Sequence, residues 1–274
     1  MKWRVEKVNF STDTVELYGE ILIPKGEGPF PGVVLCHGMA SDSRSMRPTA
    51  QRIVRHDIAA LTFDFRGHGR STGVLNNNID QDAAAALNLL RQHVRIDPER
   101  IALVGHSMGA IAALCAATTV KDIKALVFLS VPAEIDGFME FWAPLRTKAK
   151  RTGIHIIEFP SSGPFPMLGW FNGLTSRLWM WLRNYRLRIK LEQKVDSWSN
   201  LNPLTNIQKI GNFPKLFVHC KGDKWVPYQK TLSLYDKAEQ PKELILTDGG
   251  FHVSPLLPGK LRRQWINWLV STLK

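Results

Sequence analysis

Short apolar runs rich in β-branched residues recur along this chain of 274 residues, and amphipathic segments separate them. The runs that we expect to form strands lie at residues 15–23, 32–36, 59–64, 101–105, 125–130, 215–220 and 243–247. The segments that we expect to form helices lie at residues 46–55, 79–94, 108–118, 228–238 and 258–273. Such an alternation is typical of a mostly parallel sheet wrapped by helices. The sequence therefore predicts an α/β fold.

The alternation stops between about residues 132 and 205, a stretch that holds five of the nine tryptophans, and it resumes at Lys215. We therefore expect one α/β core formed by residues 1–131 and 206–274, with residues 132–205 inserted as a cap. Within the cap, residues 185–192 alternate as a strand would, but they also continue an apolar helical stripe. Both structures stay open for that segment.

The composition is that of a globular protein. About 44% of the residues are hydrophobic and 22% are charged, which excludes a disordered chain, a fibrous repeat or a coiled coil. Charges are scattered through the first seven residues, where a secretory signal needs an apolar stretch, and no apolar run is long enough to cross a membrane. Cys36, Cys115 and Cys220 each lie in an apolar run. We expect buried free thiols and a cytoplasmic protein.

A Gly-His-Ser-Met-Gly segment at residues 105–109 comes directly after an expected strand and directly before an expected helix. So sharp a turn strains the backbone of its central residue, and the glycines on either side let neighbouring chain pass close. The hydroxyl of Ser107 then protrudes, and the N-terminus of the helix favours negative charge that develops beside it. Ser107 is the candidate nucleophile.

A serine hydroxyl needs a base, and the base needs an orienting carboxylate. His252 lies in a glycine-bearing loop after the last expected strand, and Asp223 directly follows the strand expected at residues 215–220. All three side chains would thus lie at carboxyl ends of strands, in the chain order Ser, Asp, His. We expect Asp223 to orient His252 and His252 to activate Ser107.

With these residues in place, the chain resembles the α/β-hydrolase family over about 200 residues, everything except the insertion. Besides the serine turn, the resemblance rests on His37-Gly38 after a strand, on the segment Asp-Phe-Arg-Gly-His-Gly-Arg-Ser at residues 64–71, and on Gly222-Asp223 followed by Val226-Pro227. The resemblance implies an α/β-hydrolase fold and a serine hydrolase.

The family pattern also implies two further parts of the site. The backbone N–H groups of Met39 and Met108 would form the oxyanion hole. Some relatives carry the acid after the preceding strand instead, which makes Asp136 an alternative to Asp223. Asp248, in the same loop as His252, is a weaker alternative.

The remaining histidines receive no catalytic role. We expect His37, His68 and His106, which lie inside the family motifs, to shape loops; no partner pattern surrounds His56, His93, His155 and His219. No group of Cys, His and carboxylate residues has metal-ligand spacing, and neither glycine-containing turn has the spacing of a nucleotide loop. We expect no metal and no other cofactor.

The net charge of +12 is concentrated in the insertion. Between residues 146 and 190 a local net charge of +8 arises from one acidic residue, Glu158, and nine basic ones: Arg146, Lys148, Lys150, Arg151, Arg177, Arg183, Arg186, Arg188 and Lys190. The insertion must emerge where the parallel strands end, so we expect it to cover Ser107. Its charge fits a solvated face, contact with an anionic membrane, or attraction of anionic substrates such as acyl thioesters of CoA. No binding module points to nucleic acid.

The expected activity is that of a serine carboxylester hydrolase acting through an acyl-enzyme on small esters of short to medium acyl chains or aromatic acids. Relatives that look similar include esterases, feruloyl-type esterases and monoacylglycerol lipases. A pocket would be lined by Trp142, Trp170, Trp181 and Trp225. A thioesterase, an amidase or peptidase, an acyltransferase and an inactive binding scaffold stay open as alternatives.

Overall fold

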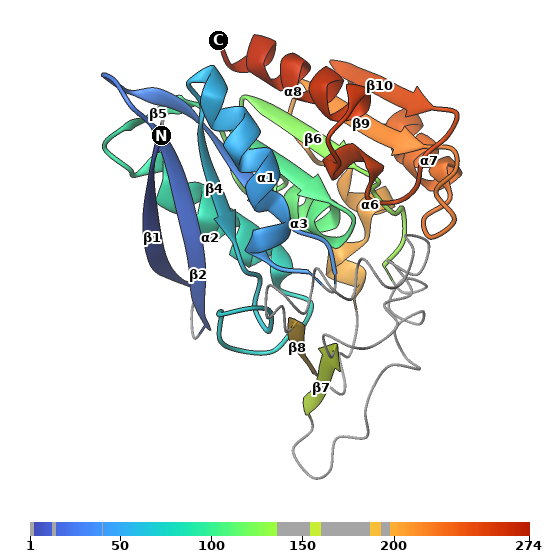
Figure 1. Ribbon diagram of the computed structural model, residues 1–274. Helices are drawn as coiled ribbons and strands as arrows, with labels where there is room; N and C mark the ends of the chain where they lie inside the picture. The colour runs from blue at the N-terminus through green and yellow to red at the C-terminus, as the bar shows by residue number, and fades with distance from the viewer. Residues whose placement is uncertain (1–2, 13–14, 40, 136–153, 160–186, 193–197) are drawn as a thin grey trace.

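The computed structural model describes residues 3–12, 15–39, 41–135, 154–159, 187–192 and 198–274 (Figure 1). Its main feature is an eight-stranded sheet in the order β1-β2-β4-β3-β5-β6-β9-β10. The strands are β1 (Trp3–Thr12), β2 (Val15–Pro24), β3 (Phe30–Cys36), β4 (Ala59–Phe63), β5 (Ile96–His106), β6 (Ala125–Leu129), β9 (Lys215–Cys220) and β10 (Lys242–Thr247). From β4 to β10 every pair is parallel, whereas β2 runs antiparallel to both β1 and β4. The predicted α/β fold is confirmed.

Strand β1 is missing from the expected strands. It pairs antiparallel with β2 along its whole length and forms the edge of the sheet. Its apolar residues change phase between Val5 and Val8, which hides the period of two that marks a strand. The pairing with β2, rather than the local pattern, defines this strand.

Helices cover both faces of the sheet (Figure 1). On one face, α1 (Ser43–Ile53) and α8 (Lys260–Leu273) pack against the strands; on the other lie α2 (Ile79–Arg91), α3 (Met108–Ala116) and α7 (Tyr228–Lys237). All five expected helices are present, with ends within three residues of the expected ones. Shorter pieces are η1 (Val54–His56), η3 (Ser199–Leu201), α6 (Pro203–Asn206) and η4 (Ser254–Leu256).

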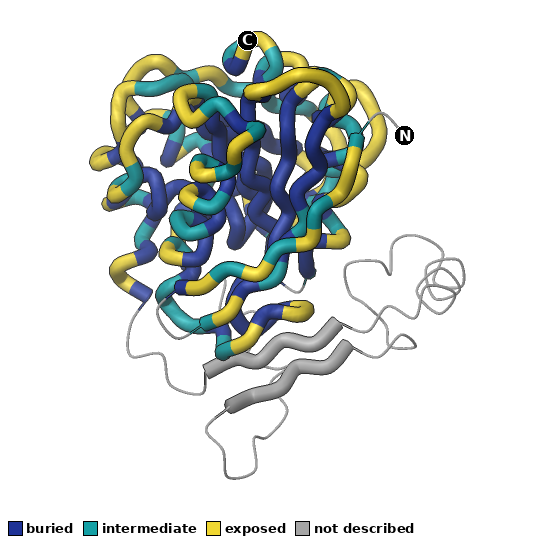
Figure 2. The backbone as a smooth tube through the Cα atoms, turned by 90° about the vertical axis from the view of Figure 1, so that its left-hand side faces the viewer, coloured by how far each residue is buried: buried dark blue, intermediate teal, exposed yellow. Residues whose placement is uncertain are grey.

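The core consists of the apolar strands and the inner faces of these helices. Figure 2 shows the central strands as buried and the outer loops as exposed. Strands β3, β4, β6 and β9 are buried at every residue, because parallel strands are covered on both faces. This rigid sheet fixes the positions from which the loops at its carboxyl edge depart.

The insertion point is confirmed by the sheet. β6 pairs directly with β9, Leu126 opposite Lys215, although more than 80 residues separate them in the chain. Between them the structure describes β7 (Ile154–Phe159) and β8 (Leu187–Glu192), an antiparallel pair that lies below the large sheet in the view of Figure 1. Residues 187–192 therefore form a strand, one of the two structures left open. The domain limits 132–205 stay a prediction.

Candidate active site

Ser107 occupies the turn between β5 and α3 in a backbone conformation that side chains rarely adopt, with φ 54° and ψ −119°. The flanking glycines are required by close packing. A Cβ at Gly105 would lie 2.3 Å from the carbonyl oxygen of Gly109, and a Cβ at Gly109 would lie 2.3 Å from that of Cys36. Any side chain at either position would therefore push the turn out of place. The strain expected at Ser107 is present in the structure.

Asp223 and His252 are in direct contact. Nδ1 of His252 lies 2.7 Å from Oδ2 of Asp223, and both side chains are buried. The other carboxylate oxygen, Oδ1, accepts hydrogen bonds from the backbone N–H groups of Trp225 at 2.9 Å and Val226 at 3.1 Å. Burial by itself raises the pKa of a carboxyl, but hydrogen bonds from His219 and His252 outweigh it and hold the pKa of Asp223 well below its usual range. Asp223 is thus an anion fixed in orientation.

The loop that carries His252 is tied to the serine turn. The backbone carbonyl of His252 accepts hydrogen bonds from Ser130 Oγ and from Nε2 of His106, each at 3.0 Å. Burial lowers the pKa of His106 to about 3, so its ring is neutral and donates from Nε2. The rings of His106 and His252 lie 4.8 Å apart between centroids. Because His106 directly precedes Ser107, this contact places the loop of the expected base next to the turn of the expected nucleophile.

The segment after β3 passes close to Ser107. A Cβ at Gly38 would lie 2.9 Å from Nδ1 of His106 and 3.3 Å from Cβ of Ser107. Met39 follows in the chain, and Met108 is the first residue of α3, where a backbone N–H has no acceptor within the helix. Both methionines are buried. The structure therefore places the two expected oxyanion donors on the two segments that flank Ser107.

His37 and His68 shape loops, as expected from the sequence. The ring of His37 donates from Nδ1 to the carbonyl of Gly38 at 2.8 Å and accepts at Nε2 from the N–H of Phe65 at 3.1 Å, while Nδ1 of His68 donates to the carbonyl of Arg66 at 3.0 Å. Burial lowers the pKa of His37 to about 4 and that of His68 to about 3. Both rings are neutral, and their hydrogen bonds hold the loops after β3 and β4 in place.

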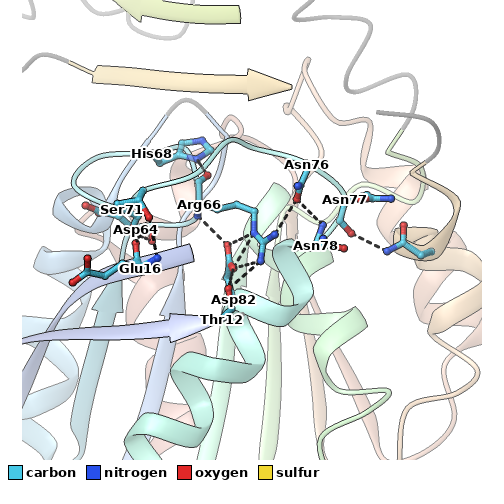
Figure 3. A network of polar contacts seen from close by, with 12 residues as sticks. Thr12, Glu16, Asp64, Arg66, His68, Ser71, Asn76, Asn77, Asn78 and Asp82 are labelled. Carbon is cyan, nitrogen blue, oxygen red and sulfur yellow. Dashed lines mark hydrogen bonds and ion pairs between the residues drawn. The ribbon is translucent and has the colours of Figure 1, made fainter. Parts of the chain in front are cut away.

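A buried ion pair fastens the loop after β4 (Figure 3). Nη2 of Arg66 lies 2.7 Å from Oδ1 of Asp82 in α2, and the backbone N–H of Arg66 donates to Oδ2 at 2.9 Å. The guanidinium also donates to Thr12 Oγ1 in β1 and to Asn76 Oδ1. The arginine thus ties the loop to the edge strand and to the first turn of a helix.

Asp64, the first residue after β4, holds the same loop in place as well. Its carboxylate accepts the N–H groups of Ser43 at 2.7 Å and Arg70 at 2.8 Å. A Cβ at Gly69, where φ is +50°, would lie 2.2 Å from Oδ2 of Asp64. The acidic and glycine positions of the 64–71 segment therefore serve the shape of the loop.

The structure describes one of the two alternative acids, Asp248, and one of the four pocket candidates, Trp225. Asp248 is exposed, and its Oδ1 pairs with Nζ of Lys221 at 2.6 Å, so its carboxylate is occupied away from His252. Asp136 lies outside the described residues, as do the pocket candidates Trp142, Trp170 and Trp181. The fourth, Trp225, stacks on the ring of His252 at 5.8 Å between centroids.

Other expectations can be compared with the described part of the chain. Cys36, Cys115 and Cys220 are buried and free. Within the described residues no helix is long and apolar enough to cross a membrane, and no group of His, Cys, Asp and Glu could hold a metal ion. Of the nine basic residues counted in the insertion, only Arg188 and Lys190 lie in described segments. Contact of the cap with a membrane stays a prediction.

Sequence reasoning misses one residue that contacts Asp223, namely His219. His219 is the fifth of the six residues of β9, and no partner pattern surrounds it in the sequence. In the structure its Nε2 lies 3.1 Å from Oδ2 of Asp223 and its ring is fully buried. The available signal was the spacing of four residues between His219 and Asp223 at the end of one strand.

The comparison with protein families decides which fold family this is. The model described as "Alpha/beta hydrolase family" matches residues 33–260, from β3 to the first residue of α8. This range includes the serine turn, Asp223 and His252. The chain belongs to the alpha/beta hydrolase family. The resemblance based on the sequence motifs is confirmed.

Individual proteins align over nearly the whole chain. "Polyketide transferase ATR5" from Stachybotrys chlorohalonatus is 33% identical over 272 residues, covering 91% of this chain and 90% of that protein. The structure of the alpha/beta hydrolase GrgF from Penicillium sp. sh18 superposes with a TM-score of 0.76 at 19% identity, covering 99% of this chain and 98% of GrgF. The esterase Pf2001 from Pyrococcus furiosus superposes with a TM-score of 0.67 at 21% identity, covering 99% of this chain and 90% of the esterase. Family membership supports hydrolase activity in general.

Proposed function

We propose that this alpha/beta hydrolase is a serine carboxylester hydrolase that uses Ser107, His252 and Asp223. The observation that carries the proposal is that the loop of His252, which is hydrogen-bonded to Asp223, is also hydrogen-bonded to the Ser107 turn through His106. The strained Ser107 turn follows β5, and the hydrogen-bonded pair of Asp223 and His252 follows β9 and β10. A buried carboxylate on Nδ1 of a histidine beside a strained serine is the arrangement that acyl transfer needs.

The reaction follows from the roles of the ring nitrogens. Because Nδ1 of His252 donates to Asp223, Nε2 carries the lone pair that takes the Ser107 proton as Oγ attacks the ester carbonyl. The N–H groups of Met39 and Met108 bind the resulting oxyanion, each worth roughly 3 to 4 kcal/mol. His252 then gives its proton to the departing alcohol. Water, deprotonated by His252, releases the acid and restores Ser107.

Trp225 supports an apolar acyl or aromatic-acid substrate. Its indole is half-buried and stacks on the ring of His252 with an interplanar angle of 21°. An aromatic face beside the catalytic base offers a surface against which an acyl chain or an aromatic ring packs. Esters of short to medium chains or of aromatic acids are the substrates that we expect.

A fluorophosphonate probe and a panel of esters test the proposal. We expect the wild-type protein to be labelled, and Ser107→Ala to lose both the label and ester turnover, by about 10⁴-fold or more in kcat. Ser233→Ala, which removes an exposed hydroxyl on α7, is the matched control and should keep both. The panel contains nitrophenyl esters of increasing chain length beside acyl-CoA and aminoacyl amides. Labelling of Ser107→Ala, or no ester turnover by folded wild-type protein, would contradict the proposal.

Acyl transfer is the second candidate, favoured by the similarity to ATR5, which is named a polyketide transferase. In that case an alcohol or amine, rather than water, would attack the acyl-enzyme on Ser107. The two are separated by adding acceptor alcohols to the esterase assay and measuring the ratio of transfer product to free acid. A ratio above one at millimolar acceptor would favour transfer; free acid as the main product would favour hydrolysis.

A further inference from the structure

The end of β6 lies between the strands that carry the proposed nucleophile and the proposed acid. β6 pairs with β5 on one side and with β9 on the other. Ser107 follows β5, and Asp223 follows β9. The residue directly after β6 is Ser130, which is fully buried. Ser130 therefore lies at the carboxyl edge of the sheet, between two of the three proposed catalytic segments.

The backbone of Ser130 has a φ of 52°, a conformation that side chains rarely adopt. Within the described part of the chain, four residues other than glycine have a positive φ. Two of them, Asp57 and Asp122, are exposed, and aspartate tolerates this conformation better than most residues do. The other two, Ser107 and Ser130, are buried and directly follow neighbouring strands. The two buried cases of backbone strain thus lie together at the proposed site.

Hydrogen bonds connect the end of β6 to all three proposed catalytic segments. The backbone carbonyl of Leu129 accepts the N–H of Ser107 at 2.9 Å. The N–H of Ser130 donates to the carbonyl of Val218 in β9, also at 2.9 Å. Oγ of Ser130 donates to the backbone carbonyl of His252 at 3.0 Å, and the hydroxyl must be the donor because a carbonyl oxygen has no proton. Two adjacent residues thus join the serine turn, the strand before the acid and the loop of the base.

The hydroxyl of Ser130 gives a reason for the strain at this position. A glycine would adopt the same φ without steric cost, but it would supply no donor to the carbonyl of His252. That carbonyl has a second donor, Nε2 of His106, which approaches from the serine turn. Because the accepting oxygen belongs to His252 itself, the two hydrogen bonds fix the backbone from which the proposed catalytic ring projects. The orientation of that ring therefore depends on both donors.

We propose that Ser130 is a positioning residue for the reaction described above, whose hydroxyl holds the backbone of His252 in place relative to the Ser107 turn. This inference rests on the proposed function, in which His252 is the base. Ser130 is fully buried and acts through His252 rather than on the substrate. Misplacing the base slows the chemical steps but leaves substrate binding unchanged. Loss of the hydroxyl should therefore lower kcat and not raise KM.

Ser130→Ala and Ser130→Gly separate the hydroxyl from the strain. Both variants lose the donor, but only glycine relieves the positive φ. In both we expect kcat for an ester to fall about three- to tenfold with KM nearly unchanged, because one buried hydrogen bond is lost. We also expect Ser130→Gly to melt about 2 °C above Ser130→Ala. Activity would then follow the hydroxyl, whereas for a residue with only a structural role it would follow stability.

Asp57→Gly is the matched control for the strain. It relieves a φ of 60° at an exposed residue just before β4 begins, at the edge of the sheet opposite the proposed site. It should raise the melting temperature and leave kcat and KM unchanged. Wild-type kcat in both Ser130 variants would overturn the inference. A kcat that falls in Ser130→Ala and is restored in Ser130→Gly would overturn it as well, because stability rather than the hydroxyl would then set the rate.

Amide hydrogen exchange measured by mass spectrometry tests the positioning without turnover. In both Ser130 variants we expect faster exchange in residues 249–254, the loop of His252, and unchanged exchange in β3 and β4. Asp57→Gly should leave that loop as it is in the wild type. Exchange in the loop as slow as in the wild type, in both Ser130 variants, would overturn the inference. If folded wild-type protein turned over no ester while the exchange changed as expected, the proposed function would fail and the link between Ser130 and the loop would remain.

Discussion

Two buried carboxylates, Asp82 and Asp223, show how different partners give the same group different uses. Neither side chain is exposed, and each accepts a backbone N–H and a charged or ring N–H. Asp82 pairs with Arg66 near the edge strand, whereas Asp223 lies between His219 and His252 at the carboxyl edge of the central sheet. The first carboxylate contacts a guanidinium, which does not lose its proton, whereas the second contacts two imidazole rings, a side chain that can act as an acid or a base.

The pKa values of the two carboxyls move in opposite directions. Burial raises the pKa of Asp82, and the hydrogen bonds and charge of Arg66 offset only part of it. Burial also opposes ionisation of Asp223, but the hydrogen bonds from His219 and His252 outweigh burial, and its pKa is held well below the usual range. The Arg66 pair is therefore suited to holding a loop in place, and the Asp223 group is suited to holding a base in orientation.

The largest expected effect is on catalysis at Asp223. Asp223→Asn keeps the shape of the side chain but removes the charge that orients His252, so we expect kcat to fall about 10⁴-fold. Steady-state ester turnover, with circular dichroism to verify folding, measures it. Near-normal turnover would contradict the role of Asp223 and favour Asp136, the alternative acid. Asp136→Asn is the variant to compare.

At Asp82 the expected effect is on stability instead. Asp82→Ala leaves Arg66 as a buried charge without its carboxylate, which should lower the free energy of unfolding by about 3 to 5 kcal/mol. The double variant Arg66→Met with Asp82→Leu should lose less, because no charge is left unpaired. Urea titrations of both variants measure the difference. If the single variant proved as stable as wild type, the ion pair would not be a brace.

Acid should weaken the protein through the neutral histidines around the site. Burial lowers the pKa of His37 to about 4 and those of His68 and His106 to about 3, below the ordinary value of 6.5. At pH values between these lowered pKa values and 6.5, the unfolded chain binds more protons than the folded one. The free energy of unfolding therefore rises with pH in this range, and stability is lost as the pH falls below 6.5. From pH 7 to pH 5 the loss is at most about 2 kcal/mol for each ring.

Denaturant titrations at several pH values test this dependence. In His68→Gln one of the three rings is absent, so the loss from pH 7 to pH 5 should shrink by about a third. The carboxyls of Asp64 and Asp82, whose pKa values burial raises, act in the opposite direction, because they bind protons more readily in the folded chain than in the unfolded one. A pH dependence identical to that of the wild type would mean that His68 does not contribute.

The smallest effect is expected at Asp248. Its carboxylate is exposed and pairs with Lys221, so Asp248→Asn should change kcat by less than about twofold. Asp248→Asn is the matched control for Asp223→Asn, because it makes the same substitution in the neighbouring loop. A loss comparable to that of Asp223→Asn would show that the loop, rather than one carboxylate, supports His252.

Sequence reasoning succeeded where a local pattern has a local cause. The glycines around Ser107 mark a turn because their missing side chains make room within a few residues, and the five helices follow from their own apolar periodicity. It failed for β1, whose partner strand defines it, and for His219, whose contacts come from a turn and from α7. Residues 187–192 were undecided until pairing with β7 made them a strand.

The sequence by itself determined the α/β fold, the position of the insertion, and the chain order of Ser107, Asp223 and His252 at the ends of strands. Only the tertiary structure decided that His252 contacts Asp223 while Asp248 turns to Lys221, and that a second histidine shares the carboxylate. Backbone strain and burial periodicity arise from neighbours in the chain. Hydrogen bonds between separate loops depend on strand register and packing, which no short segment encodes.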